Sequence, residues 1–401
     1  MVTDSGDAAV TPDHLAGAGQ PSAGHVLCLI NEAWFFRSHF MPWALAARAA
    51  GFDVTVLGAP ETGAGAADDG GVSFLPSSAR RAGWRPQGLW AAARELRDQA
   101  DRLGVSVVHV FGLHGMAIAA LARLAGLRLP LVVSVTGTGF LATIRGPVRL
   151  AARALAAVTA RLLDAGEPVW LCENRDDAAV LRLGRADREG RVTILTGAGV
   201  DPVRFVPAPL PERPPLRLIL VARMVRSKGV DLAVAAVALA REQGLDVTLT
   251  LVGSPDPANP RALGAEELAA FARTEGVSHL GRRSDIEQLL GTHHAFILPS
   301  RGGEGLPKAL LEAAAAGRPA IVTDVPGCRD FVVDGEGGFV VPAEDAEALA
   351  VAIERAGRSD LAAMGAKARA AVERSATVAQ VSAAVVEVYC RLAGRAGAPI
   401  T

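Results

Sequence analysis

The chain has 401 residues, of which half are hydrophobic and 21% are charged, and its formal net charge is -1. A single packed core rarely exceeds about 250–300 residues, so this length predicts two domains, and the apolar fraction excludes a disordered protein. The near-zero net charge gives no global attraction for nucleic acid, so no nucleic-acid partner is expected. The four cysteines form no Cys-x-x-Cys pair, which favours buried free thiols over a metal knot or a redox motif.

The first 24 residues are rich in Gly, Ala, Ser and Pro and contain three aspartates. They lack a positively charged segment followed by an apolar run, so residues 1–24 are predicted to be a disordered tail and not a secretory signal. The longest Ala/Leu/Val-rich stretch, residues 150–171, is interrupted by two arginines, an aspartate and a glutamate. Charges at these positions argue against a membrane span, and we therefore expect a cytoplasmic protein.

Over residues 25–205, short β-branched runs alternate with longer Ala/Leu/Arg-rich segments. Apolar runs of this kind, buried on both faces, are typical of parallel sheets with helices between the strands. The predicted strands are residues 25–30, 54–57, 72–75, 107–111, 131–135, 169–171 and 192–195. This alternation predicts a first doubly wound domain.

Residues 206–215 contain five prolines, a density that excludes both a helix and a central strand, so this segment is predicted to be a linker. The alternation restarts over residues 216–375, and residues 376–401 are expected to form a helix that packs back toward the first domain. The predicted strands of this half are residues 216–221, 247–252, 295–298, 320–322 and 339–341. The sequence therefore predicts an α/β protein of two doubly wound, Rossmann-like domains that face a central cleft.

The first candidate motif, residues 221–229, reads Val-Ala-Arg-Met-Val-Arg-Ser-Lys-Gly. It follows a predicted strand and precedes a predicted helix, so Arg223 and Lys228 are expected to reach into the cleft. Two fixed cations beside a helix N-terminus suit a diphosphate. The alternative is that both side chains are simply solvated at the start of a helix.

The second candidate motif, residues 298–317, reads LPSRGGEGLPKALLEAAAAG. Its glycines let the backbone approach a ligand closely, and its proline fits the start of a helix. The amides near Gly305 and Leu306 are then expected to point at an anion, helped by the helix dipole. Glu304 in the loop and Glu312 in the helix are placed to accept hydrogen bonds from sugar hydroxyls beside that anion. A helix with an acidic first turn is the alternative.

These motifs resemble those of retaining glycosyltransferase family 4, which has the GT-B fold. Glu304, which begins the sequence Glu-Gly-Leu-Pro, and Glu312 are separated by seven residues, and this pair resembles the family's signature. Ala222-Arg223 with Lys228-Gly229 resembles its diphosphate clamp. Five further segments resemble either its C-terminal half or a bacterial branch that extends lipid-linked sugars for capsule, O-antigen or protein glycosylation. They are residues 317–342, 251–260 and 281–290, together with TGTGF at 136–140 and GAGVD at 197–201. The resemblance covers roughly residues 25–390.

The resemblance implies a hexosyltransferase of cell-surface polysaccharide biosynthesis. It would move a hexose or N-acetylhexosamine from a nucleotide sugar, expected to be UDP-linked, to a polyprenyl-diphosphate-linked sugar or another glycan. Arg223 and Lys228 would neutralise the leaving diphosphate, while Glu304 would contact the donor sugar and Glu312 the ribose hydroxyls. The remaining donor-site residues implied by the resemblance are Gly305, Leu306, Arg282 and Gly253.

The implied reaction uses no cofactor and no metal. Near the motifs there is no Asp-x-Asp sequence of the kind that binds a metal in the other large glycosyltransferase fold. The leaving group would depart through an oxocarbenium-like state, and the acceptor would attack on the same face. The enzyme would then supply positioning and stabilisation of the departing charge.

The N-terminal domain is expected to hold the acceptor. Many family members carry a histidine where this chain reads Ser134-Val135-Thr136-Gly137, and Thr136 takes its place here. His109 and His114 are alternatives for the acceptor base, although each is expected to be a strand-end or loop residue. The acceptor-side candidates are Thr136, Gly137, His114 and Arg37.

The same domain offers a local basic and aromatic patch. Arg145, Arg149 and Arg153 recur at four-residue spacing, which places them on one face of a helix. The other members of the patch are Arg80, Arg81, Trp84, Arg85 and Trp90. Such a mixture suits membrane headgroups or the pyrophosphate of a polyprenyl lipid and predicts peripheral membrane contact. An ordinary solvated face with core indoles is the alternative.

Three other functions fit a doubly wound architecture. A nicotinamide dehydrogenase is excluded, because residues 29–33, after the first predicted strand, contain no glycine-rich turn. A sugar-nucleotide 2-epimerase of the same fold would act on the free nucleotide sugar and form no acceptor-linked product. The third is a non-catalytic GT-B partner subunit. The intact site residues argue against loss of activity: Arg223, Lys228, Glu304 and Glu312.

Overall fold

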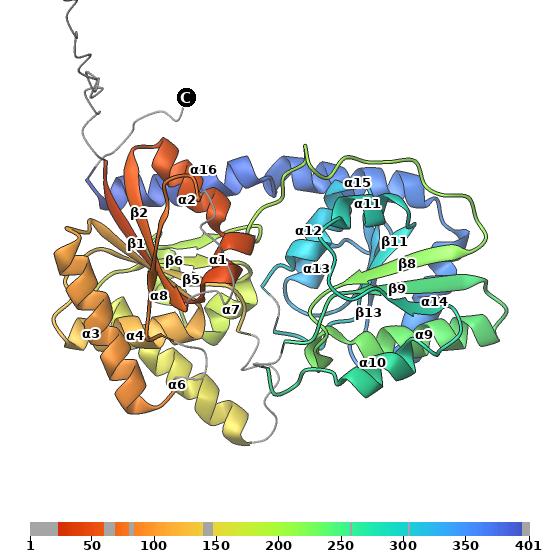
Figure 1. The fold of residues 1–401 in the computed structure, drawn as a ribbon, viewed down its shortest axis with the longest axis horizontal. Helices are drawn as coiled ribbons and strands as arrows, with labels where there is room; N and C mark the ends of the chain where they lie inside the picture. The colour runs from red at the N-terminus through yellow and green to blue at the C-terminus, as the bar shows by residue number, and fades with distance from the viewer. Residues whose placement is uncertain are drawn as a thin grey trace, which may run out of the picture.

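The computed structural model of the chain describes residues 23–59, 69–79, 84–138, 147–256, 259–303 and 305–394. It consists of two α/β halves that lie side by side, and helices from the end of the chain run along one side of both halves (Figure 1). Each half is built around its own parallel sheet. The predicted α/β class with two doubly wound units is confirmed.

The N-terminal half contains a seven-stranded sheet in the order β3-β2-β1-β4-β5-β6-β7, in which every neighbouring pair is parallel. Its strands are β1 Gly24–Glu32, β2 Phe52–Ala59, β3 Ser73–Pro76, β4 Val107–Phe111, β5 Leu131–Val135, β6 Val169–Cys172 and β7 Val192–Ile194. All seven overlap the strands predicted from the sequence. The residues of β4, β5 and β6 are buried throughout, as expected for strands covered on both faces.

Helices cover both faces of this sheet. They are α1 Ala33–His39, α2 Met41–Ala49, α3 Pro86–Arg102, α4 Gly112–Leu124, α6 Pro147–Asp164, α7 Arg175–Val180 and α8 Gly184–Arg188. Apolar residues of α3, α4 and α6 form the core on one face, and those of α1 and α2 contribute to the core on the other.

The C-terminal half contains a six-stranded parallel sheet in the order β10-β9-β8-β11-β12-β13. Its strands are β8 Leu216–Val221, β9 Val247–Val252, β10 Val277–His279, β11 Ala295–Leu298, β12 Ala320–Thr323 and β13 Gly338–Val341. Five of these were predicted and β10 was missed. With three residues and one apolar side chain, the edge strand β10 carries too short a pattern to be recognised.

The helical elements of this half also lie on both faces of its sheet. They are η1 Arg226–Lys228, α9 Val230–Glu242, α10 Ala265–Phe271, α11 Ile286–Gly291, α12 Lys308–Ala315, α13 Cys328–Phe331, α14 Ala346–Arg358 and α15 Leu361–Ser375. Residues of α9 and α14 pack on one face, and those of α12 and α13 on the other.

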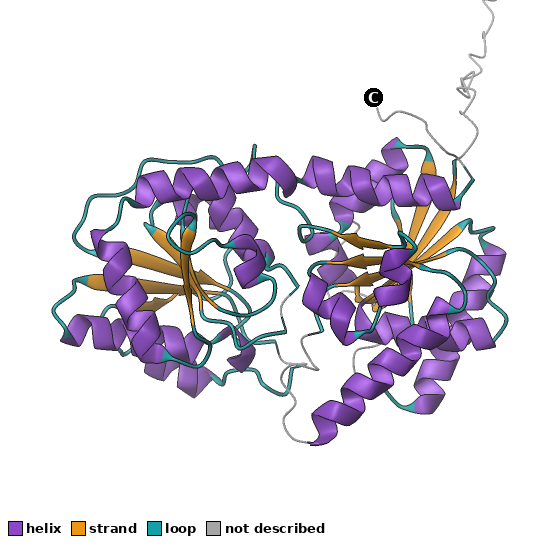
Figure 2. Cartoon of the chain, turned by 180° about the vertical axis from the view of Figure 1, so that it is seen from behind, coloured by secondary structure: helices purple, strands orange, loops and turns teal. Residues whose placement is uncertain are grey.

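Two stretches of chain cross between the halves. Residues 206–215 contain no helix or strand, as their proline content predicts. The last helix, α16 Val378–Leu392, packs against α2, and the Tyr389 hydroxyl lies 2.6 Å from Nδ1 of buried His109. The chain just before the first crossing is tied to the second. Val200 exchanges backbone hydrogen bonds with Ala376 and Val378, both at 2.9 Å. Figure 2 shows α15 and α16 spanning both halves from the opposite side.

The strand order of each sheet reverses at one point. The reversal lies between β1 and β4 in the N-terminal half and between β8 and β11 in the C-terminal half. In open parallel sheets, ligands bind beyond the carboxyl ends of the strands at such a switch point. The segment after β8 carries Arg223 and Lys228, and the segment after β11 carries the glycine-rich motif.

Candidate active site

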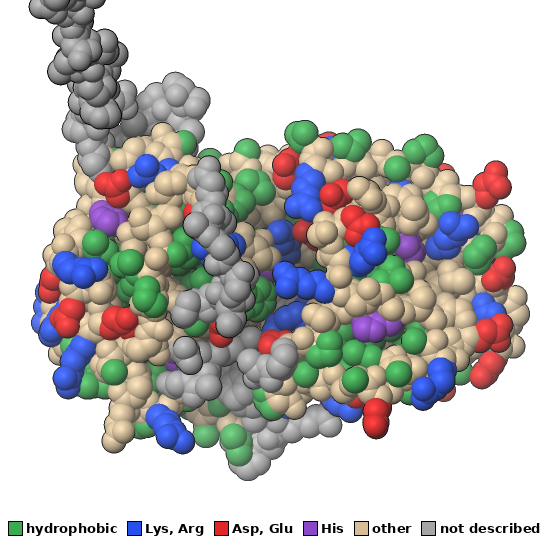
Figure 3. All heavy atoms as spheres, viewed as in Figure 1, with side chains coloured by type: hydrophobic (Ala, Val, Ile, Leu, Met, Phe, Trp, Pro, Cys, Tyr) green, Lys and Arg blue, Asp and Glu red, His purple; other side chains and the backbone are tan. Residues whose placement is uncertain are grey.

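A hollow lies between the two halves in Figure 3, and Lys and Arg side chains gather along its C-terminal wall. Three cations act on one imidazole of the opposite wall. Burial lowers the pKa of His39, at the end of α1, to about 3, and the positive charges of Lys308, Lys228 and Arg223 contribute to the shift. Lys308 is the cation with a direct contact there, because its Nζ donates a hydrogen bond to the carbonyl of the neighbouring Ser38.

Arg223 is held in place by a carboxylate. Its Nη1 donates a hydrogen bond to Oδ2 of Asp256 at 2.6 Å, and the Asp256 side chain is only 11% exposed. Gly253 lies directly beneath this segment, since a Cβ there would lie 1.8 Å from the carbonyl oxygen of Ala222. The absence of a side chain at Gly253 thus lets the strand that precedes Arg223 pass the end of β9.

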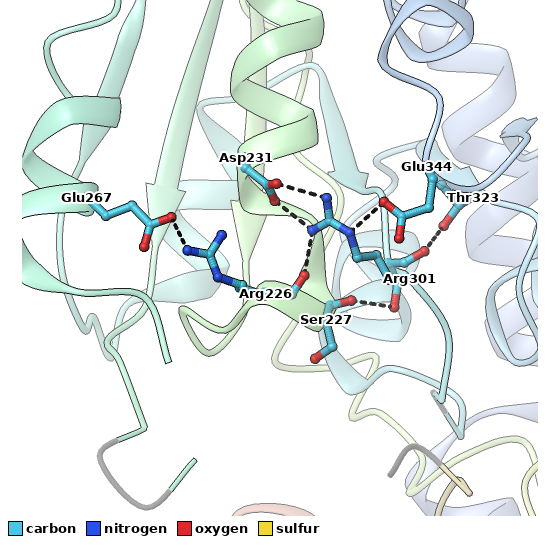
Figure 4. Close-up of polar contacts among 8 residues, drawn as sticks. Arg226, Ser227, Asp231, Glu267, Arg301, Thr323 and Glu344 are labelled. Atoms are coloured by element: carbon cyan, nitrogen blue, oxygen red, sulfur yellow. Dashed lines mark hydrogen bonds and ion pairs between the residues drawn. The ribbon is translucent and has the colours of Figure 1, made fainter. Parts of the chain in front are cut away.

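Arg301 ties the glycine-rich loop to the η1 turn, as Figure 4 shows. Its guanidinium donates hydrogen bonds to both oxygens of Asp231, at 2.7 and 2.8 Å, and to Glu344 at 2.7 Å. The same side chain donates to the carbonyl of Arg226, and its backbone amide donates to the carbonyl of Ser227 at 2.8 Å. The loop after β11 and the turn that bears Lys228 are therefore held in a fixed relation.

The glycine-rich motif meets the N-terminal half at the start of α12. The amide of Leu306 donates a hydrogen bond to Oε2 of Glu173, which follows β6, at 2.7 Å. A Cβ on Gly305 would lie 1.8 Å from the same oxygen and 3.0 Å from the carbonyl carbon of Thr136. Glycine at 305 thus permits the close approach, and Gly305 lies beside the backbone of Thr136 of the other half. Glu304 lies outside the described residues.

The loop that carries Thr136 and Gly137 is anchored by a buried carboxylate. Both the amide and the hydroxyl of Thr138 donate to Oδ1 of Asp177, at 3.0 and 2.6 Å. Asn174 caps α7 by accepting from the Asp177 amide at 2.8 Å. Burial raises the pKa of the Asp177 carboxyl, and these hydrogen bonds counteract part of the shift. The network places the segment after β5 beside the segment that carries Glu173.

Glu312 lies in α12 with its carboxylate largely enclosed. Its side chain is 13% exposed, and its Oε1 lies 3.6 Å from Nζ of Lys308. Burial raises the pKa of Glu312, and the charge of Lys308 works in the opposite direction. Nζ of Lys308 also donates to the carbonyl of Ser38 across the cleft at 2.5 Å. An enclosed carboxylate of this kind is a strong acceptor for hydroxyl groups.

Arg282, one of the donor-site residues implied by the resemblance, lies in the stretch after β10. Arg282 is exposed, and Arg283 pairs with Asp285 at 2.7 Å, also at the surface. The backbone of this stretch is linked to the donor side, because the Gly253 amide donates to the carbonyl of Gly281 at 2.8 Å. In this stretch, the backbone is therefore held in place by a hydrogen bond, whereas both guanidinium groups lie at the surface.

Two acceptor-side candidates, Arg37 on α1 and His114 on α4, lie in the helices that follow β1 and β4, the strands on either side of the switch point. His114 is 4% exposed, lies 2.7 Å through Nδ1 from Oδ1 of Asn31, and contacts the ring of Trp84 edge-on at 5.0 Å. Arg37 donates two hydrogen bonds to Asp69, at 3.0 and 2.8 Å. Its guanidinium also covers the ring of Phe74, at 3.9 Å from the centroid. Arg37 thus contributes to the fold of this half.

Part of the basic and aromatic patch can be located. Arg80, Arg81 and Arg145 lie outside the described residues. Trp84 is 51% exposed, while Trp90 is half-buried and lies 5.6 Å from the guanidinium of Arg94. Arg149 is exposed and Arg153 is half-buried, both on α6. In the described part of the chain, no group of three or more His, Cys, Asp or Glu side chains is arranged to hold a metal ion.

Sequence reasoning missed Glu173, Asp256, Asp231 and His39. Glu173 follows a predicted strand end, which is a usable signal, because parallel strands present their carboxyl ends at one edge of the sheet. Asp256 lies in a segment that carried the family resemblance, but its pairing with Arg223 depends on how two loops meet. No sequence pattern singles out His39, whose environment comes from the opposite half of the molecule.

The chain resembles known proteins over both halves. Residues 39–169 match the family model described as Glycosyltransferase Family 4, and residues 215–358 match the one described as Glycosyl transferases group 1. The putative colanic acid biosynthesis glycosyltransferase WcaL of Escherichia coli (strain K12) is 34% identical over 162 residues, covering 38% of this chain and 39% of that protein.

A second relative acts on a lipid-linked sugar, according to its name. It is the N,N'-diacetylbacillosaminyl-diphospho-undecaprenol alpha-1,3-N-acetylgalactosaminyltransferase of Campylobacter jejuni. It is 26% identical over 175 residues, covering 40% of this chain and 44% of that protein. The chain thus matches about two fifths of the length of these curated relatives.

The whole fold has solved counterparts. Anabaena HepE, solved in complex with UDP and glucose, superposes with a TM-score of 0.70 at 16% identity, covering 91% of this chain and 99% of that chain. At this identity the likeness shows the fold, which is GT-B. With a family 4 domain in its N-terminal half and a group 1 domain in its C-terminal half, the chain belongs to the glycosyltransferases.

Proposed function

We propose that the chain is a retaining hexosyltransferase of cell-surface polysaccharide biosynthesis. It moves a hexose or N-acetylhexosamine from a nucleotide sugar, UDP-linked in this proposal, to a polyprenyl-diphosphate-linked sugar or another glycan. The observation that carries the proposal is the position of Arg223 and Lys228, after β8, beside the glycine-rich loop after β11, to which Arg301 ties the η1 turn at the switch point of the sheet. Such a cationic wall beside the N-terminus of α12 suits a departing diphosphate.

The relatives support this choice of substrates. HepE was solved with UDP and glucose and with UDP-glucose, WcaL is named for colanic acid biosynthesis, and the Campylobacter relative is named for an undecaprenol-linked acceptor. We assign the donor to the C-terminal half and the acceptor to the N-terminal half, where Thr136, Gly137, His114 and Arg37 are the candidate residues.

The proposed reaction is a same-face substitution. The bond from the anomeric carbon to the diphosphate oxygen breaks, and Arg223 and Lys228 neutralise the charge that develops on that oxygen. The acceptor hydroxyl attacks the same face of the sugar, and its proton passes to the departing phosphate oxygen. Glu304 positions the donor sugar, and Glu312 accepts hydrogen bonds from the ribose hydroxyls. Thr136 takes no part in proton transfer.

A donor screen with and without chelator tests this proposal. In excess EDTA, the cognate nucleotide sugar at a hundred times its dissociation constant is expected to stabilise the protein by about 2.7 kcal/mol, seen as a rise in melting temperature. The cations and helix amides do the work that a magnesium ion does in other transferases, so the shift should survive the chelator. A shift that appears only with Mg²⁺ or Mn²⁺ would overturn metal independence, and no shift with any nucleotide sugar would overturn the donor site.

We further propose that the N-terminal half attaches to the membrane surface through α6. No helix in the described ranges combines the length and apolar character needed to cross a bilayer. Five large hydrophobic side chains of α6 are nevertheless between 54% and 71% exposed: Val148, Leu150, Leu155, Val158 and Leu162. Val148, Leu155 and Leu162 recur every seven residues and so share one face, and exposed Arg149 and Arg161 flank them. An apolar stripe with basic neighbours is typical of an interfacial helix.

Vesicle co-sedimentation tests the attachment. The protein should bind vesicles that contain phosphatidylglycerol, and binding should weaken as salt rises, since each basic residue near an anionic surface contributes about 1 kcal/mol. The double variant Leu155→Glu, Leu162→Glu is expected to remain in the supernatant, and Arg149→Ala with Arg153→Ala to bind less. Val351→Glu, at a 53% exposed position on α14, is the matched control and should bind like the wild type. Equal binding by all variants would contradict attachment through α6.

A further inference from the structure

The carboxylate of Glu173 binds a backbone amide of the predicted donor-site motif. Oε2 of Glu173 accepts the hydrogen bond of the Leu306 amide at 2.7 Å, two residues before the first residue of α12. Amides at a helix N-terminus lack partners within the helix and favour anions, because the helix dipole adds partial positive charge there. A carboxylate at this amide is a chemical equivalent of a phosphate oxygen.

The approach of this carboxylate is built into the chain. The same oxygen lies 1.8 Å from the point where a Cβ of residue 305 would stand, so only glycine admits it. Glu173 follows β6 of the N-terminal half, whereas Leu306 belongs to the C-terminal half. The hydrogen bond therefore joins the two halves at the start of α12.

We propose that Glu173 is a gate of the donor site, in that its carboxylate holds the Leu306 amide when no donor is bound and withdraws when a donor diphosphate enters. This gate rests on the proposed function. One amide hydrogen cannot serve the carboxylate and a phosphate oxygen together, and two anions a few ångströms apart repel each other. Donor binding thus breaks a bond between the halves and couples entry of the donor to movement of the N-terminal half.

Asp176 provides a matched control. It also lies in the N-terminal half, three residues from Glu173, and it accepts a hydrogen bond across the cleft from Nη2 of Arg329 at 2.8 Å. This ion pair is partly exposed, at 48% for Asp176 and 37% for Arg329, and it involves neither Glu173 nor the Leu306 amide. Removing Asp176 therefore loosens the contact between the halves without freeing the Leu306 amide.

Calorimetric titration with UDP in EDTA separates the possibilities. Glu173→Ala is expected to bind UDP about 10-fold more tightly than the wild type, equivalent to about 1.4 kcal/mol. Glu173→Gln, which keeps an acceptor oxygen but loses the charge, should fall between them, and Asp176→Ala should match the wild type. Circular dichroism confirms that each variant is folded.

Each other outcome has a distinct meaning. Wild-type affinity or weaker binding in Glu173→Ala would overturn the gate while leaving the donor site intact. Equal tightening in Asp176→Ala would also overturn it, because the effect would then come from loosening the two halves. If the wild type binds neither UDP nor any other nucleoside diphosphate, the proposed function fails, and the gate fails with it.

Discussion

Replacing Arg223 or Lys228 by Ala is expected to lower kcat for glycosyl transfer by about 10²–10³-fold, the range found when one group that stabilises a developing anion is removed. Both residues lie in the segment after β8, at the switch point of the C-terminal half. The substrate diphosphate gains most of its negative charge as the bond to the sugar breaks, so the loss should appear in kcat more than in KM.

Arg226→Ala is the matched control for the clamp. Arg226 lies in the same η1 turn, but its side chain is 54% exposed and pairs with Glu267 at 3.0 Å. Its removal should leave kcat within about two-fold of the wild type, since exposed ion pairs contribute little. Initial rates of nucleoside diphosphate release give all three values. Wild-type kcat in both Arg223→Ala and Lys228→Ala would remove the clamp assignment.

Replacing Glu312 by Ala is expected to raise the dissociation constant of the nucleotide donor by about 10- to 100-fold. The carboxylate is largely enclosed in α12, and a hydrogen bond to a charged group contributes about 1.5–3 kcal/mol. The reason is loss of hydrogen bonds from the ribose hydroxyls, so binding of the nucleotide should weaken whatever the sugar.

Glu312→Gln separates charge from shape. It keeps an acceptor oxygen at the same place and should raise the dissociation constant less than Glu312→Ala does. Titration calorimetry with the nucleoside diphosphate measures both. An unchanged dissociation constant in Glu312→Ala would show that this glutamate serves the helix and not the nucleotide, and its 3.6 Å contact with Lys308 would then be its main role.

Much of the fold could be predicted because long apolar runs and the proline-rich segment are local patterns. The buried strands β4 and β5 coincide with the predicted residues, and residues 206–215 form neither helix nor strand. The short edge strand β10 was missed because three residues carry no periodicity. Its neighbour β9 supplies its pairing, which is a tertiary effect.

The candidate site, like the fold, could be predicted from the sequence only where the pattern is local. Arg223 and Lys228 could be placed because a strand end followed by a helix fixes where such residues lie. The partners of the two donor motifs could not be predicted, since Asp256 meets Arg223 and Glu173 meets the Leu306 amide only after separate loops, or separate halves, come together. The apolar face of α6 was also hidden in the sequence, where its leucines and valines look like core residues.

The most direct test of the central claim is the anomeric configuration of the product, measured by NMR after incubation with an α-linked nucleotide sugar and a polyprenyl-diphosphate-linked acceptor. We predict an acceptor-linked sugar in the α configuration, with one nucleoside diphosphate released for each sugar transferred. A β-linked product would contradict the retaining assignment. Conversion of the free nucleotide sugar into another nucleotide sugar, with no acceptor-linked product, would contradict glycosyl transfer and identify an epimerase.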